Sequence, residues 1–300
     1  MADVGSTAIP AGRHVRHGRP GLNADARLWQ VGIQLLLLTG GALWLDFSLQ
    51  ASQFALALAA ALLTQMAWLF GLRLKGVGYL SALITGCGIA LLLRADNLWV
   101  HPLAACLAIS AKFSLRHAGK HIWNPANFGV IVALLLLPSA WASPGQWGQG
   151  VAVAVWLTAF GALVSRRAGS SATSWCFLLV FLALAAARFH WLGYEAERIP
   201  ELLWKQASNG ALLLFAFFML SDPMTLPNHW LARLLHASIV AALAFVWQFL
   251  YYANHGPLWA LFLLSPLTIL WDRWLASPKP YWFRRERQPG RVSPHPPATG

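Results

Sequence analysis

The sequence predicts an all-α, polytopic integral membrane helix bundle with about ten transmembrane helices and both termini in the cytoplasm. Of the 300 residues, 58% are hydrophobic and only 11% are charged, whereas soluble globular proteins carry roughly 25% charged residues. The apolar residues form successive runs, most of them near the ~17–25 residues that a helix needs to cross ~30 Å of hydrocarbon. Lys and Arg gather in alternate loops between these runs, as they do in membrane proteins with positively charged cytoplasmic loops.

Ten apolar runs are expected to be the transmembrane helices of one membrane domain, residues 28–272. They cover residues 28–47, 51–71, 78–93, 97–115, 125–141, 148–165, 173–192, 203–220, 231–252 and 257–272. Segment 1–27 is basic and polar, and the apolar run after it is too long for the core of a signal peptide, so we expect a cytoplasmic tail. Segment 273–300 is basic and Pro-rich and has few apolar groups to bury, so we expect a disordered cytoplasmic tail.

The distribution of Lys and Arg predicts both the number of helices and their orientation. With the N-terminus inside, 18 of the 22 Lys and Arg residues fall on the inner side. The other four fall on the outer side: Arg94, Arg188, Arg198 and Lys205. Merging two runs would move every later loop to the opposite side and remove this asymmetry. The net charge of +12 is therefore assigned to membrane topology and not to a nucleic-acid partner.

Several classes of site are not expected. Cys87, Cys106 and Cys176 lie within apolar runs and form no CxxC pair, which argues against a disulfide framework or a zinc site. His101 and His190, near outer helix ends, are interpreted as interfacial residues and not as haem ligands. The sequence has no GxGxxG, Walker, HExxH, GxSxG or iron–sulphur cysteine motif, so no catalytic residue of a self-contained enzyme is assigned.

Three polar segments interrupt the apolar helices, and all three are expected at the cytoplasmic face: residues 81–86, 119–129 and 221–227. In the second, Asn124-Pro125 is a favoured N-cap and first helical residue. The free N–H groups of such a helix start can hold an anionic or carbonyl-rich group. In the third, Asp222 is an ionisable residue at membrane depth, which suggests function. Alternatively, Asp222 caps a helix or pairs with Lys120 or Arg233.

These segments supply the candidate site residues Ser81, Thr85, Asn124, Asn127, Ser221, Asp222 and Thr225. Ser81, Asn124 and Asp222 are expected to form one polar cluster, because an unsatisfied polar group in hydrocarbon costs several kcal/mol. Asp272 is instead expected at the membrane interface, where water can replace its partners. No metal site is predicted.

The same segments carry a resemblance to a known family. SALITG (81–86), NPANFG (124–129) and NGALLLFAFFMLSDPMT (209–225) resemble, in this order, the membrane subunits NqrB of the sodium-pumping NADH:quinone reductase and RnfD of the Rnf ferredoxin:NAD complexes. The third segment is similar to the family pattern of a small-residue helix that runs into a TDPVT-like turn. The resemblance covers roughly residues 70–272 and includes the count of ten helices.

This resemblance implies electron transport in a bacterial-type inner (plasma) membrane. The chain would be a component of a membrane oxidoreductase, with redox partner proteins or other subunits, and would be coupled to ion translocation. The family members carry a covalent flavin on a threonine in a long outer insertion between helices 5 and 6, where this chain has only residues 142–148. Ser170-Ser171-Ala172-Thr173 looks similar but lies on the inner side, where it is interpreted as an N-cap.

We therefore expect no covalent flavin, and instead FMN or riboflavin held non-covalently by the candidate site residues. A membrane transporter or an assembly subunit without a redox cofactor is the alternative, because transporters also hold their substrates between broken helices.

Overall fold

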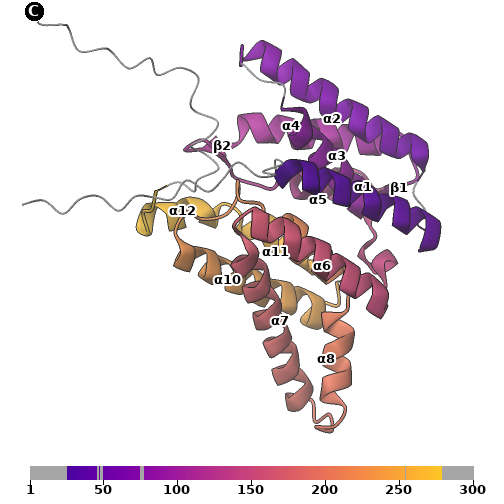
Figure 1. Cartoon of the computed structure of the whole chain (residues 1–300), viewed down its shortest axis with the longest axis vertical. Coiled ribbons are helices and arrows are strands. Elements are labelled where there is room, and N and C mark those ends of the chain that lie inside the picture. Colours follow the sequence, from indigo (N-terminus) through magenta and orange to yellow (C-terminus); the bar gives the residue numbers. More distant parts are fainter. Residues whose placement is uncertain (1–25, 46, 48–49, 75–77, 254, 279–300) are drawn as a thin grey trace, which may run out of the picture.

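The computed structural model describes residues 26–45, 47, 50–74, 78–253 and 255–278 (Figure 1). The two predicted tails, 1–27 and 273–300, therefore lie almost entirely outside the described residues. Within the described residues the chain is mostly helical, with four short strands. An all-α fold is thus confirmed in its coarse form.

The first half of the chain forms five helices: α1 (Ala26–Trp44), α2 (Ala51–Gly71), α3 (Tyr79–Leu92), α4 (Val100–Ser114) and α5 (Pro125–Leu136). Helix α5 begins where the sequence predicts, because the Asn124 side chain accepts the Asn127 N–H at 3.1 Å and Pro125 fits the first helical position. Strand β1 (Leu93–Ala95) pairs antiparallel with β4 (Ala140–Ala142), and β2 (Arg116–His117) pairs with β3 (Lys120–His121).

The second half contains more breaks. Its elements, after the short 3-10 helix η1 (Pro144–Trp147), are α6 (Val151–Arg167), α7 (Ser171–Trp191), α8 (Ile199–Ala207), α9 (Gly210–Leu214), the π-helix η2 (Phe215–Met219), α10 (Trp230–Leu250), α11 (Gly256–Leu264) and α12 (Leu267–Trp274). The predicted helix 203–220 bends by 51° between α8 and α9, where Asn209 caps the new helix start. The predicted helix 257–272 breaks at Pro266, which has no N–H for a continuous helix.

A helix therefore lies in each of the ten predicted ranges, but few of these helices are long. Among the described residues, three are long and apolar enough to cross a membrane: Ala51–Gly71, Ser171–Trp191 and Trp230–Phe249. The bent pair α8–α9 with η2 would be a fourth. The predicted helix 125–141 stops at Leu136 because Pro138 follows and the chain turns into β4.

The two halves share one packing scheme. In the first half, α1 and α2 pack on α3, α2 packs on α4, and α4 packs on α5. In the second half, α6 and α7 pack on α9–η2, α7 packs on α10, and α10 packs on α11. Figure 1 shows α1 to α5 on one side of the molecule and α6 to α12 on the other. The halves meet where α1 packs on α6 and α5 packs on α11.

Glycines allow equivalent helix pairs in the two halves to approach closely. A Cβ atom at Gly129 of α5 would lie 2.6 Å from the Ala104 carbonyl oxygen of α4, and one at Gly256 of α11 would lie 2.8 Å from Trp247 Cβ of α10. Small residues at helix interfaces are characteristic of bundles in lipid, where close van der Waals packing drives association.

Candidate functional site

The second and third polar segments meet at the start of α5. The Asn124 side chain donates from Nδ2 to Asp222 Oδ2 at 3.2 Å. The other carboxylate oxygen of Asp222 accepts the Met224 N–H at 2.9 Å, and the Thr225 hydroxyl donates to the Asp222 carbonyl at 3.1 Å. The predicted proximity of Asn124 and Asp222, which lie 98 positions apart in the sequence, is therefore confirmed.

Lys112 of α4 connects the first polar segment to this pair. Its ammonium group donates to Ser81 Oγ at 2.8 Å and to Gln65 Oε1 at 2.7 Å. The Lys112 charge also acts on the Asp222 carboxylate. We call the residues Gln65, Ser81, Lys112, Asn124, Asp222 and Thr225 the inner network. Sequence reasoning missed Gln65 and Lys112, although a lysine and a glutamine inside apolar runs were the signal that could have found them.

Asp222 has an altered acidity. The residue keeps some exposed surface, but its carboxylate is densely surrounded by protein, and this burial raises the pKa of Asp222 above its usual value. The hydrogen bonds from Met224 and Asn124 and the charge of Lys112 oppose the shift. Asp222 therefore retains its proton to a higher pH than an exposed aspartate does.

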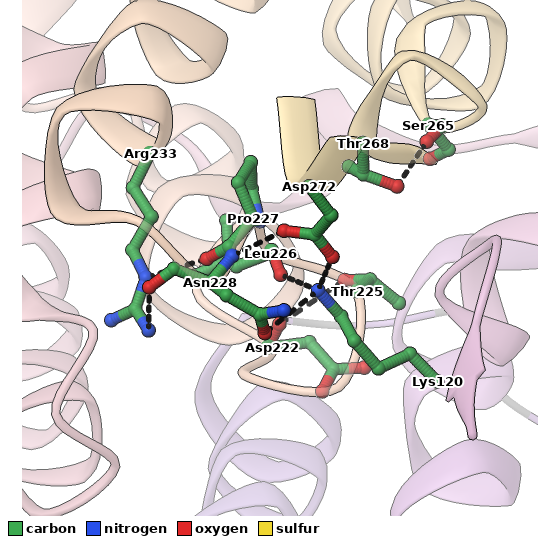
Figure 2. A network of polar contacts seen from close by, with 10 residues as sticks. All are labelled: Lys120, Asp222, Thr225, Leu226, Pro227, Asn228, Arg233, Ser265, Thr268 and Asp272. Atoms are coloured by element: carbon green, nitrogen blue, oxygen red, sulfur yellow. Dashed lines mark hydrogen bonds and ion pairs between the residues drawn. The ribbon is translucent and has the colours of Figure 1, made fainter. Parts of the chain in front are cut away.

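A second set of contacts lies beside the inner network (Figure 2). Lys120 donates to Asp272 Oδ2 at 2.6 Å, to the Leu226 carbonyl at 2.5 Å and to Asn228 Oδ1 at 3.3 Å. The Asn228 N–H donates to Asp272 Oδ1 at 2.6 Å. These contacts join the β2–β3 hairpin of the first half to α12 and the loop after η2 in the second half.

This arrangement corrects two predictions. Lys120 forms its ion pair with Asp272, and Arg233 donates to the carbonyl oxygens of Pro227, Asn228 and Gly169. Asp272 is not an isolated interfacial residue, since only 19% of its side chain is exposed. Asp272 lies in the short helix α12, which follows the break at Pro266, and its carboxylate there contacts Lys120.

The remaining predicted residues make other contacts. The Thr85 hydroxyl donates to the Ser81 carbonyl at 3.0 Å, and the Ser221 hydroxyl donates to the Phe217 carbonyl, so both bond within their own helices. Asn127 Nδ2 donates to the Leu258 carbonyl of α11 at 3.1 Å. Asn127 Oδ1 is buried and has no partner among the described residues.

Ser170 and Thr173 lie at a helix start, as predicted, but the capping detail differs. Helix α7 begins at Ser171, and the Thr173 N–H donates to the Ser170 carbonyl at 3.0 Å. The Ser170 hydroxyl points back to the Ser165 carbonyl, because the preceding turn places that acceptor within its reach. Thr173 itself is 1% exposed.

His121 lies next to the hairpin residue Lys120 and is buried. Burial, together with the charges of Lys112 and Arg116, lowers the pKa of His121 to about 3, so its ring is neutral at pH 7. Its Nδ1 atom has no hydrogen-bond partner among the described residues, and the same holds for Nδ1 of the buried His236 in α10.

The buried polar atoms without hydrogen-bond partners show whether the donors and acceptors of a flavin would find partners at this site. The pyrimidine edge of a flavin offers one N–H donor and carbonyl acceptors. Asn127 Oδ1 and the Nδ1 atoms of His121 and His236 are acceptors or donors without a partner in the described part of the chain, and Lys112 adds a positive charge. The donor and acceptor types therefore fit such a group.

No protein-family model matches this chain, and a comparison with curated proteins found no significant match.

Proposed function

We propose that the chain is a membrane subunit for electron transport, similar to NqrB and RnfD, that holds FMN or riboflavin non-covalently at the inner network. One observation carries the proposal. The three segments behind the resemblance are far apart in the sequence, yet the Asn124–Asp222 bond joins the second to the third. Lys112 bonds to Ser81 of the first segment and also acts through its charge on Asp222. Motifs that served only as separate helix caps would not need to meet.

The proposal places ten helices across a bacterial-type inner membrane, with both termini in the cytoplasm. It is supported by the 18 inner and four outer Lys and Arg residues and by a helix in each predicted range. Reporter fusions after residues 48, 96, 145, 197 and 255 should report an outer location, and fusions after residues 75, 118, 168 and 228 an inner one. An inner signal at residue 197 would contradict the ten-helix topology.

A bound flavin would supply the electron chemistry, and the chain would bind and orient it. Asn127 Oδ1 would accept the ring N–H, Lys112 would stabilise negative charge on the ring, and Asp222 would hold a proton close by. Redox partner proteins or other subunits would supply and remove the electrons.

The absorption spectrum of the purified full chain tests the proposal. We expect a flavin spectrum, and no fluorescent protein band after denaturing electrophoresis because the flavin is not covalent. Asn124→Ala should lower the flavin content several-fold. Asn209→Ala is the matched control, since Asn209 caps α9 with the same geometry outside the inner network. A colourless wild-type protein, or equal flavin loss in both variants, would contradict the proposal.

A transporter without a redox cofactor is the second candidate, and the shared packing scheme of the two halves favours it. If every repeated helix crosses the bilayer, an odd number of helices in the first half makes the second half run in the opposite direction. Inverted repeats with broken helices are typical of secondary transporters. Solute or ion flux into liposomes that contain the colourless protein would decide for this candidate.

A further inference from the structure

A second polar cluster lies at the other end of α3, remote from the inner network. Arg94 follows α3 in strand β1 and is 1% exposed. Its Nη1 donates to the carbonyl oxygens of Ala90 and Leu93 at 2.7 and 2.6 Å, and its Nη2 donates to Gln146 Oε1 at 2.7 Å. All of these acceptors are neutral.

Arg94 differs in this respect from the other two buried cations. Lys120 pairs with Asp272 and Lys112 lies within the field of Asp222, whereas Arg94 has no carboxylate partner in the described part of the chain. Burial lowers the pKa of Arg94 to about 10, which still leaves it charged at pH 7. The carboxyl end of α3 offers only about half a negative charge. A buried positive charge therefore remains partly uncompensated.

Three nitrogen atoms around Arg94 have no hydrogen-bond partner among the described residues: Arg94 Nε, His101 Nδ1 and Trp147 Nε1. Shared contacts with the Leu93 carbonyl and the Phe47 ring place the three residues beside one another. His101 Nε2 shares the Leu93 carbonyl with Arg94 at 3.1 Å. The Phe47 ring lies 5.7 Å from the Arg94 guanidinium and 4.8 Å from the Trp147 ring, centre to centre. Buried polar atoms without partners cost free energy, and the unpaired N–H groups of Arg94 and Trp147, one of which belongs to the buried cation itself, suit a negatively charged ligand.

The shared packing scheme of the two halves relates this cluster to the inner network. Arg94 follows α3 just as Asp222 follows η2, and α3 corresponds to α9–η2. The length of α3, about 21 Å at 1.5 Å per residue, separates Arg94 from the Ser81 end of the helix. The repeated architecture thus carries a cation at one end and a carboxylate at the other.

We propose that Arg94 and Trp147 form a binding site for a small anion, for which chloride and formate serve as probes. The Nε–H of Arg94 and the Nε1–H of Trp147 would donate to the anion. This site is independent of the flavin proposal, because it shares no residue with the inner network.

Thermal unfolding of the purified full chain in a neutral detergent tests this site. Isethionate, a larger anion, is replaced by chloride or formate at constant ionic strength, and unfolding is followed by tryptophan fluorescence. We expect a saturable rise in Tm of a few degrees for the wild type and none for Arg94→Gln. Arg188→Gln is the matched control, since the Arg188 guanidinium also lies 5.7 Å from a phenylalanine ring, and it should keep the response.

Two further variants keep the test decisive. If Arg94→Gln does not fold, Trp147→Phe should raise the half-saturating anion concentration several-fold. Asp46 precedes Phe47 in the sequence, and Asp46→Asn tests whether the chain supplies the negative charge itself. A wild type that does not respond to anions while Asp46→Asn does would overturn the proposal. A response in Arg94→Gln equal to that of the wild type would also overturn it.

Discussion

The buried cations at the two ends of α3 have different kinds of partner. At the inner network and beside it, Lys112 and Lys120 have the carboxylates of Asp222 and Asp272 nearby. At the other end, the partners of Arg94 among the described residues are carbonyl and amide oxygens. A buried charge is stable only when it is paired and hydrogen-bonded. At one end of α3 the chain therefore supplies carboxylates for its buried cations. At the other end no carboxylate of the described residues accompanies Arg94, which is why we propose an anion there.

The largest effect is expected when the Lys120–Asp272 pair loses one partner. Lys120→Met leaves the Asp272 carboxylate without its cation and should lower the free energy of unfolding by about 3–5 kcal/mol. Titration with a denaturing detergent, followed by tryptophan fluorescence, measures it. The double variant Lys120→Met/Asp272→Leu should recover part of the loss. A double variant that is less stable than Lys120→Met would show that the pair is not the source of the effect.

A smaller effect is expected at Arg94 in a buffer without small anions. Arg94→Gln removes three hydrogen bonds worth about 0.5–1.5 kcal/mol each, but it also removes an uncompensated buried charge. The two terms partly cancel, so we expect a net loss of about 1–2 kcal/mol in the same unfolding assay. A loss as large as that of Lys120→Met would mean that Arg94 has a strong counter-charge, and the contrast between the two ends would disappear.

Asn124 allows the contribution of the inner network to be separated from ordinary helix capping. Asn124→Ala removes the cap of α5, worth about 0.5–2 kcal/mol, and also the bond to Asp222, worth about 1 kcal/mol. Asn209→Ala removes a cap alone. Asn124→Ala should therefore be the more destabilising of the two by about 1 kcal/mol. Equal losses would indicate that the Asn124–Asp222 bond contributes nothing to stability.

The β2–β3 hairpin contributes a dependence of stability on pH. His121 is neutral in the folded protein, with a pKa of about 3, but takes up a proton near pH 6.5 when unfolded. The unfolded state thus binds more protons at acidic pH, so this contribution is fully favourable above pH 6.5 and is lost as the pH falls. One pH unit below 6.5, the loss is about 1.4 kcal/mol.

His121→Gln should make the stability less dependent on pH between pH 7 and pH 5.5. The exposed His117 of the same hairpin supplies the matched control, His117→Gln. Wild-type and His121→Gln unfolding curves that shift equally with pH would show that His121 does not titrate on unfolding.

The sequence by itself determined the positions of the helices and the nature of their ends. Apolar runs, the Asn124-Pro125 cap and the turn at Ser221-Asp222 are local features, because helix formation and capping depend on residues within about one turn. The same local features single out Ser81, Asn124 and Asp222 as candidate site residues.

Only the tertiary structure decided which polar groups are partners. Lys120 and Asp272 lie 152 positions apart, and their pairing depends on how α12 turns after Pro266, which no local pattern specifies. For the same reason, only the tertiary structure shows that Lys112 and Gln65 belong to the inner network, and that Arg94 has no carboxylate partner in the described part of the chain. The strength of an interaction between buried charges depends on the distance between them and on their desolvation, and both are set by the packing of whole helices.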